Sequence, residues 1–226
     1  MNNDLVTAVR AELRALADPD RATEMRAYMK SAMPFLGVPG SLRKPLARRV
    51  FRAYPCASKG DWLATVRTLW RDATYREERY VAVELAGHRP YLVWHGPDLL
   101  PDYAELIVTG AWWDYTDEIA IRHVGPILAA HRDVVTPIMR AWSTDADRWK
   151  RRTSVICQIK AKADTDRALL ADCVEANLDD RDFFLRKGIG WALRQHAKTD
   201  PAWVRRFVAD HPGLSPLSVR EALKHL

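Results

Sequence analysis

A tryptophan and an aspartate four residues apart could do chemistry together. Trp113 and Asp117 lie in the segment GAWWDYTDEIA. Residues four apart share one face of a helix, so we expect the indole and the carboxylate to lie one turn apart. A carboxylate held in place can stabilise a nearby positive charge, and an indole can stack on one. The alternative is that Asp117 is an ordinary carboxylate in the first turn of a helix, favoured by the helix dipole.

A second group combines cations with a tryptophan. In RKGIGWALRQHAK, the residues Lys187, Trp191, Arg194 and Lys198 follow one another at spacings of four, three and four. On a helix they form one basic stripe that contains an aromatic ring. Such a stripe suits DNA, because the cations neutralise phosphates while the indole offers a stacking surface. The alternative is an amphipathic helix whose long side chains merely reach water.

Two further basic runs are candidates for phosphate contact. The first lies in DRWKRRTS and consists of Arg148, Lys150, Arg151 and Arg152. Arg152 precedes Ile156 by one helical turn, which predicts a position at the rim of the buried side, where it could clamp a phosphate with two hydrogen bonds. The second run consists of Arg43, Lys44, Arg48 and Arg49. It fits a plain solvent face as well as a DNA contact.

Several other kinds of chemistry are not indicated. The three cysteines, Cys56, Cys157 and Cys173, lie far apart and form no C-x-x-C pair. Neither a disulfide framework nor a zinc site is therefore expected. The histidines are scattered without an H-E-x-x-H motif, and no glycine-rich phosphate loop occurs. We expect no metal and no cofactor.

The charge balance favours an acidic partner. The chain has 35 Lys and Arg against 29 Asp and Glu, a formal net charge of +6. Nucleic acid is the first candidate and an anionic membrane the second. No apolar stretch reaches the roughly 20 residues of a membrane span, and the start MNNDLVTAVRAELRALA indicates an amphipathic helix rather than a signal peptide. We expect no membrane partner and a cytoplasmic protein.

The elements that must position these residues are helices. Apolar residues recur at intervals of three and four, as in Leu46, Val50 and Phe51, and sustained strand-like alternation is missing. The predicted fold class is all-α. Because 48% of the 226 residues are hydrophobic, the chain can bury a core without disulfides. We interpret residues 1–226 as a single domain.

The helices also show a repeat. Comparable segments begin near Tyr75, Trp113, Asp147, Asp180 and Ser215, at offsets of 38, 34, 33 and 35 residues. Helical-repeat units have such periods. The spacing predicts a superhelical solenoid of HEAT-like helix pairs, in which one helix of each pair lines a concave, basic groove. A globular bundle with accidental spacing is the alternative.

Several of these segments together resemble the AlkD family of DNA alkylation-repair glycosylases. They are MRAYMKSAMPFLGV, ELIVTGAWWDYTDEIA, DRWKRRTS with CQIK, and FFLRKGIGWALRQHAKTDP with PLSVREALKH. The resemblance runs from about Tyr28 to the C-terminus, and the WWD-x-x-D and IGW-x-LR blocks occur in the family's order and spacing. It implies a C-shaped stack of HEAT-like repeats around duplex DNA. The sequence departs from the family at Gly110 and Ala111, where Lys-Ser is familiar.

The resemblance also implies roles for individual residues. Asp117 matches the family's catalytic carboxylate. Trp113 and Trp191 match the family's two cleft tryptophans, and Arg152 matches its cleft arginine. Tyr28, Lys160 and Arg194 match positions near the bound DNA. Together with the basic runs, this gives a predicted DNA-binding set of Tyr28, Arg43, Lys44, Arg148, Arg151, Lys160, Lys187 and Arg194.

The implied reaction is hydrolysis of the N-glycosidic bond of N3- or N7-alkylated purines in double-stranded DNA, such as 3-methyladenine, 7-methylguanine and bulkier adducts. Such a base is already cationic and leaves without a general acid, so the positive, oxocarbenium-like sugar is what needs stabilising. Asp117 would stabilise this sugar and hold the attacking water, while Trp113 and Trp191 would flank it. Arg152 would bind the neighbouring phosphate. By the resemblance, the base stays in the duplex, whereas most glycosylases extrude it.

A different class of protein fits part of this pattern. A non-catalytic HEAT-like scaffold could bind DNA or an acidic protein through the same groove. A scaffold has no evident reason to keep Asp117 among phosphates, which it repels, so the carboxylate favours the enzyme. We expect no obligate protein partner, and a location in the bacterial cytoplasm with the nucleoid.

Overall fold

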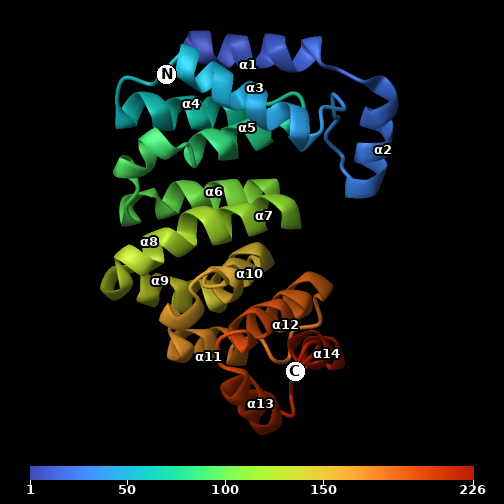
Figure 1. Ribbon diagram of the computed structural model, residues 1–226, viewed down its shortest axis with the longest axis vertical. Helices are drawn as coiled ribbons and strands as arrows, with labels where there is room; N and C mark the ends of the chain where they lie inside the picture. The colour runs from blue at the N-terminus through green and yellow to red at the C-terminus, as the bar shows by residue number, and fades with distance from the viewer. The chain divides into compact units, whose positions relative to one another are not determined.

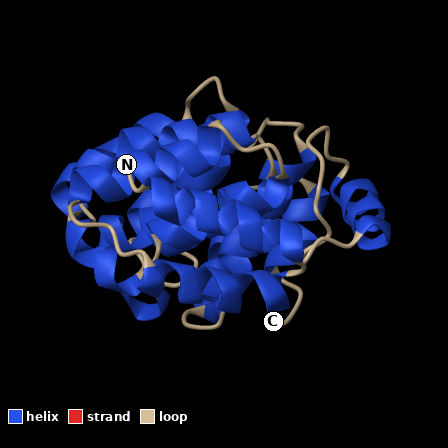
Figure 2. Cartoon of the chain, turned by 90° about the horizontal axis from the view of Figure 1, so that it is seen from above, coloured by secondary structure: helices blue, strands red, loops and turns tan.

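The computed structural model describes all 226 residues. It contains fourteen α-helices, three short 3-10 helices and one π-helical turn, and no β-strand (Figure 1, Figure 2). The prediction of an all-α fold is confirmed. The chain divides into two compact units, Met1–Trp94 and His95–Leu226. A single domain, a superhelical solenoid and a concave groove stay predictions.

The first unit is built around α1. Its elements are α1 (Asn3–Ala15), α2 (Pro19–Met29), α3 (Gly40–Ala53), α4 (Lys59–Arg71), α5 (Arg76–Ala86) and η1 (Arg89–Trp94). α1 packs against α3, α4 and α5, and α5 also packs against α3 and α4. Leu5, Leu13, Trp62 and Trp70 are fully buried between these helices. Apolar residues recur on one face of each helix, and the burial of these faces against one another stabilises the unit.

Glu77 on α5 fixes the loop that follows α2. Its buried carboxylate accepts three hydrogen bonds of 2.9 to 3.1 Å. The donors are the backbone N–H groups of Leu36, Gly37 and Val38. Gly37 has a φ of 87°, and a Cβ there would lie 2.1 Å from the carbonyl oxygen of Asp18, just before α2. The carboxylate pairs amides that burial would otherwise leave unsatisfied, and so fixes the loop that follows α2.

The second unit contains nine α-helices. Its elements are η2 (Pro97–Leu99), α6 (Leu100–Gly110), α7 (Trp113–Ile119), the π turn η3 (Ala120–Val124), α8 (Gly125–Ala130), α9 (Arg132–Ser143), α10 (Arg148–Ile156), η4 (Lys162–Asp164), α11 (Arg167–Glu175), α12 (Phe183–Ala197), α13 (Pro201–Asp210) and α14 (Pro216–Ala222). α10 packs against both α7 and α12, and α12 packs against α14. α9 packs against α10 and α11. The helices α7, α10, α12 and α14 therefore pack in this order, and the residues of the candidate site lie on the first three.

Each of the five repeat-like segments begins a helix. These helices are α5, α7, α10, α12 and α14, and the residues that precede them are Tyr75, Trp112, Asp147, Asp182 and Ser215. Successive members of that set are 37, 35, 35 and 33 residues apart in the numbering. The side chains of the last three accept backbone N–H bonds from the first turn of their helix, as good N-cap residues do. The predicted starts at Tyr75, Trp113, Asp147 and Ser215 agree to within one residue, and the start near Asp180 is early by about three.

No helix of the chain combines the length and the apolar character that a membrane crossing needs.

Candidate functional site

Asp117 and Arg152 form a paired contact between α7 and α10. Arg152 Nε donates to Asp117 Oδ1 at 2.7 Å, and Arg152 Nη2 donates to Asp117 Oδ2 at 2.8 Å. The third guanidinium nitrogen, Nη1, donates to the backbone carbonyl of Phe184 on α12. We call Asp117, Arg152 and the Phe184 carbonyl the buried junction. It fixes the carboxylate by two parallel charge-assisted hydrogen bonds.

The position of Arg152 corrects the sequence analysis. Arg152 was expected at an exposed rim, free to clamp a phosphate. Its side chain is only 6% exposed, and all three of its nitrogen atoms bind within the chain. The expectation was wrong because the period of α10 shows only where its own apolar face ends. It cannot show that α12 packs over that edge.

The electrostatics of Asp117 follow from this environment. Burial raises the pKa of the Asp117 carboxyl, because a charge is less stable away from water. The hydrogen bonds and the positive charge of Arg152 act in the opposite direction, while the charge of Asp114 adds to the rise. Arg152 is therefore the group that favours an ionised carboxylate at this place.

The predicted cleft tryptophans are half-buried. Trp113 is the first residue of α7 and Trp191 lies within α12. Neither indole takes part in an aromatic pair or hydrogen bond inside the chain. Trp112 differs, since its ring packs 6.2 Å from that of Trp149 and 5.4 Å from that of Phe184. Trp112 thus joins the starts of α7, α10 and α12, and the rings of Trp113 and Trp191 stay available to a ligand.

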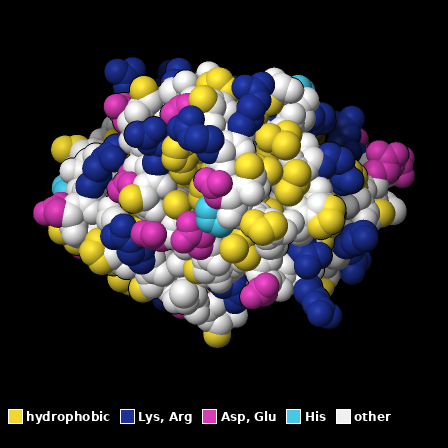
Figure 3. All heavy atoms as spheres, turned by 90° about the horizontal axis from the view of Figure 1, so that it is seen from below, with side chains coloured by type: hydrophobic (Ala, Val, Ile, Leu, Met, Phe, Trp, Pro, Cys, Tyr) yellow, Lys and Arg dark blue, Asp and Glu magenta, His cyan; other side chains and the backbone are white.

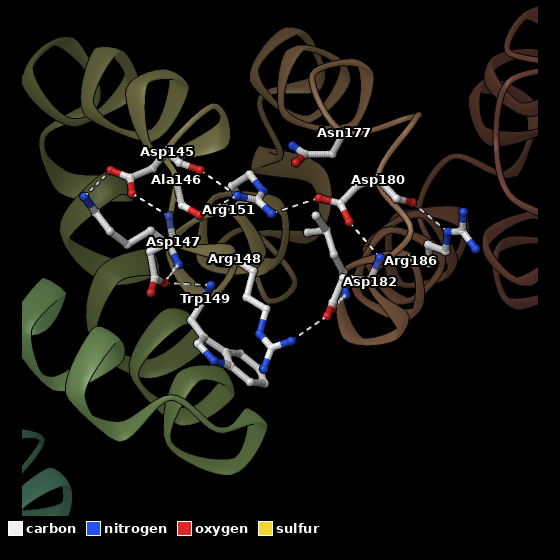
Figure 4. A network of polar contacts seen from close by, with 12 residues as sticks. Asp145, Ala146, Asp147, Arg148, Trp149, Arg151, Asn177, Asp180, Asp182 and Arg186 are labelled. Carbon is white, nitrogen blue, oxygen red and sulfur yellow. Dashed lines mark hydrogen bonds and ion pairs between the residues drawn. The ribbon is translucent and has the colours of Figure 1, made fainter.

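Cations at the start of α10 are compensated by aspartates. Arg148 Nη1 lies 2.9 Å from Asp182, and Arg151 Nη2 lies 2.8 Å from Asp180 (Figure 4). Lys150 pairs with Asp145 in the same way. We call this set the edge network; it consists of Asp145, Asp147, Arg148, Lys150, Arg151, Asp180, Asp182 and Arg186. Its four acidic and four basic side chains balance, so the basic run of the sequence is not a net positive surface.

The other predicted DNA-binding residues fall into two groups. Arg43 pairs with Glu84 at 3.0 Å, and Arg194 pairs with Glu221. The residues that are exposed and outside any ion pair are Tyr28, Lys44, Lys160 and Lys187. On the face shown in Figure 3, several Lys and Arg side chains likewise lie beside acidic ones. Tyr28, Arg43 and Lys44 belong to the first unit, and the other five belong to the second.

Two features of the site were missed by sequence reasoning, although a signal existed for both. Asp117 comes five residues after Trp112, and Arg152 comes five residues after Asp147, so the two opposite charges occupy matching positions of successive segments. The D-x-D pattern recurs too, since Asp145 Oδ1 accepts from Asp147 N–H and Asp180 Oδ1 accepts from Asp182 N–H. Aligning the repeats would have shown these matching positions and the recurring D-x-D pattern, but not the burial of Arg152 beneath α12. No cluster of three or more His, Cys, Asp or Glu side chains could hold a metal ion.

Comparison with known proteins shows the family of the chain. The family model of DNA alkylation repair enzymes matches residues 9–226. The chain belongs to the DNA alkylation repair enzyme family, which gives it a role in alkylation repair with DNA as its partner. A solved structure described as a predicted DNA alkylation repair enzyme from Enterococcus faecalis is similar, with a TM-score of 0.84 and 29% identity over 93% of this chain and 96% of that one. No curated protein matches the chain.

Proposed function

We propose that the chain is a DNA glycosylase that hydrolyses the N-glycosidic bond of N3- and N7-alkylated purines in duplex DNA. The family supplies alkylation repair and DNA as the partner. The observation that carries the finer proposal is the buried junction, which holds the Asp117 carboxylate 2.7 and 2.8 Å from two guanidinium nitrogens while 16% of its side chain stays exposed. A carboxylate that is fixed and only partly solvated is suited to stabilise a developing positive charge.

The substrate determines how much catalysis is needed. A purine alkylated at N3 or N7 carries a positive charge and departs as a neutral base, so no general acid is required. The remaining barrier is the oxocarbenium-like sugar, and Asp117 would stabilise it and hold the attacking water. Trp113 and Trp191, whose rings are free of partners inside the chain, would flank the sugar and the cationic base.

Arg152 takes a different role from the one expected. Its three donors are engaged within the junction, so we assign it to orienting the carboxylate and keeping it ionised. Among the predicted DNA-binding residues, the exposed cations that carry no ion pair are Lys44, Lys160 and Lys187, and these are then the strongest candidates for phosphate contact.

A non-catalytic scaffold is the second candidate function, and the buried junction favours it in one respect. The pair gives Asp117 a structural reason to be present, since it joins α7 to α10. Arg152 also offsets the repulsion between Asp117 and DNA. The argument that a scaffold would have lost this carboxylate therefore weakens, and activity has to decide.

The deciding experiment is single-turnover release of free base from duplex DNA carrying 7-methylguanine. The protein and its Asp117→Asn variant are compared at low salt, with DNA binding and melting temperature measured in parallel. We expect the variant to lose on the order of 100-fold or more in rate. It should bind DNA at least as tightly, because a negative charge is removed. If both proteins bind DNA and neither releases methylated base, the scaffold is the better account.

Lesion charge gives a second test. The proposed site has no group assigned to protonate a leaving base, so selectivity comes from the charge and lability of the lesion. DNA that carries uracil should survive under conditions in which 7-methylguanine is released. Efficient excision of uracil contradicts the mechanism.

We further propose a location in the bacterial cytoplasm, with the nucleoid and without an obligate protein partner, because chromosomal DNA is the proposed substrate. A fluorescent fusion that fails to overlap the nucleoid contradicts this.

A further inference from the structure

Gly188 on α12 leaves the space through which Arg152 passes. A Cβ built on Gly188 would lie 2.8 Å from Arg152 Nη1 and 3.6 Å from Arg152 Cγ. Ile156 Cγ2 is its other near neighbour, at 3.5 Å, which is ordinary contact. No backbone atom of a neighbouring helix is among these three. The missing side chain therefore serves the guanidinium of Arg152 and not the approach of two helices.

Gly190, two residues further along α12, shows the contrast. A Cβ there would lie 2.5 Å from Glu221 Cβ and 2.8 Å from the backbone carbonyl oxygen of Ser218. Both atoms belong to α14, which packs closely on α12. Gly190 therefore lets two helices approach. Both glycines lie in the same helix two residues apart. Gly188 leaves space for the side chain of Arg152, whereas Gly190 leaves space for α14.

Arg152 has little freedom to move away. Its Nε and Nη2 hold the two oxygens of Asp117, and its Nη1 holds the carbonyl of Phe184. A methyl group at position 188 would meet Nη1, so the guanidinium would have to leave Phe184 and turn. The same rigid plane carries both bonds to Asp117, so these would change as well.

We propose that Gly188 is a positioning residue for the Asp117 carboxylate and acts through Arg152. Its role in base release rests on the proposed function, while its effect on the carboxylate does not. An alanine suits the interior of α12 better than a glycine does, because alanine loses less backbone entropy in a helix. The substitution should therefore spare the fold and disturb the junction. Charged groups that bear on Asp117 are Arg152 from α10 and Asp114 from its own helix.

The direction of the effect on Asp117 follows from that balance. Burial raises the pKa of Asp117, and Arg152 opposes the rise. A displaced guanidinium opposes it less, so the pKa of Asp117 in Gly188→Ala should lie higher than in the unmodified protein. Base release depends on the ionised carboxylate, and the acid limb of its pH profile should move to higher pH.

The test compares Gly188→Ala with a matched helical control, Gly60→Ala. Gly60 lies on α4 in the first unit, and a Cβ there would meet only Ser58 Oγ, at 3.9 Å. Melting temperature, DNA affinity and the single-turnover rate of 7-methylguanine release are measured, the last from pH 4 to 8. For Gly188→Ala we expect a rate loss of about 10- to 100-fold, with an acid limb at higher pH and a melting temperature well above that of Gly190→Ala. Gly60→Ala should match the unmodified protein throughout.

Three results overturn the proposal. The first is a rate within twofold of the unmodified protein. The second is a rate loss with an unmoved acid limb. The third is a melting temperature as low as that of Gly190→Ala, which would mean that the methyl group disrupts helix packing and does not merely shift the guanidinium. Gly190→Ala shows what such damage looks like, since it should melt lower while its folded fraction keeps the normal acid limb.

A readout without activity separates this proposal from the proposed function. The carboxyl carbon of Asp117 can be followed by 13C NMR through a pH titration and assigned with Asp117→Asn. If the unmodified protein releases no base, the glycosylase proposal fails. A pKa of Asp117 that rises in Gly188→Ala and not in Gly60→Ala still supports the positioning role, and an unchanged pKa contradicts it.

Discussion

The second unit joins its helices by arginine–aspartate pairs in two different environments. In the buried junction, Arg152 and Asp117 are 35 residues apart and have side chains that are 6% and 16% exposed. In the edge network, Arg148 and Asp182 are 34 residues apart, and the Arg148 side chain is 47% exposed. The chemical groups and the sequence separation are alike. The two aspartates are about equally exposed, at 16% and 17%, so what differs is the exposure of the arginine.

That difference decides what each pair can do. At the edge, water solvates the guanidinium of Arg148, although Asp182 is only 17% exposed, so the pair contributes little energy and mainly cancels charge. In the junction, desolvation makes each partner depend on the other, because an unpaired buried charge is costly. Burial raises the pKa of Asp117, whereas a hydrogen bond from Lys150 lowers the pKa of Asp145 in the edge network. The buried junction and the edge network therefore shift the pKa of one of their aspartates in opposite directions.

The largest expected effect comes from Arg152→Ala. The change leaves the Asp117 carboxylate without its partner and the Phe184 carbonyl without its donor. We expect unfolding free energy to fall by about 3–5 kcal/mol, the usual cost of breaking a buried pair from one side. Urea denaturation at pH 7 measures it. Replacing both partners together, as Arg152→Met with Asp117→Leu, should restore most of the loss. A loss below about 1 kcal/mol would show that the Arg152–Asp117 pair stabilises the fold no more than an exposed ion pair of the edge network does.

A smaller effect is expected at the edge, and it should come from a helix cap rather than from an ion pair. Asp182 caps α12 by accepting the N–H of Leu185, and it also accepts from Arg148. We expect Asp182→Ala to cost about 0.5–2 kcal/mol, because the cap is lost. Arg148→Ala removes only the exposed pair and should cost between about 0 and 1 kcal/mol. Urea denaturation of both variants ranks them. If Arg148→Ala costs as much as Asp182→Ala, the stabilisation comes from the ion pair and not from the helix cap.

The two environments also show how far the sequence could lead. The helix starts were predictable, since Asp147 and Ser215 are strong N-caps that precede apolar periodicity. The shared face of Trp113 and Asp117 was predictable as well, because it lies within one helix. The burial of Arg152 and the slot at Gly188 were not, since both depend on how α12 packs against α10. Single-helix periodicity holds no information about a neighbour that lies about 35 residues away in the chain.

Charge was misjudged for the same reason. The run from Arg148 to Arg152 looks strongly basic when counted along the chain, and the aspartates that neutralise it include Asp180 and Asp182 of the next segment. Lys187, in contrast, kept the exposed position that its helical stripe predicted. Charge counted along the chain therefore does not show which basic residues are paired with the next segment.

A smaller effect is expected on DNA binding, where an unpaired cation can be compared with a cation of the edge network. Lys187→Gln removes an exposed cation outside any ion pair and should lower the slope of log affinity against log salt by about 0.9, as one lost phosphate contact does. The double variant Arg148→Gln with Asp182→Asn leaves the net charge unchanged and keeps a residue that can cap α12. Its salt dependence should equal that of the unmodified protein. Fluorescence anisotropy with duplex DNA between 50 and 200 mM salt measures both. A slope that falls in the double variant would mean that Arg148 contacts phosphate despite its partner.

The smallest expected effect is on how stability depends on pH. The pKa of Asp117 is higher in the folded than in the unfolded chain, so the folded state binds this proton more tightly. The stability contributed by Asp117 is then complete below the unfolded pKa of about 3.9 and is lost as pH rises through the folded pKa. Asp145 has a lowered folded pKa, so its contribution is present above about pH 3.9 and is lost as pH falls through that lowered value.

Two substitutions therefore bend the stability profile in opposite directions. Relative to the unmodified protein, Asp117→Asn should gain stability as pH rises through the raised pKa of Asp117, whatever its constant offset from leaving Arg152 unpaired. Asp145→Asn should lose relative stability as pH rises toward and through about 3.9, because the unmodified protein alone gains from ionising this residue. Urea denaturation of the three proteins at intervals between pH 3 and 7 measures both differences. Profiles that bend in the same direction would mean that Arg152 outweighs burial at Asp117 and that the two environments differ in exposure alone.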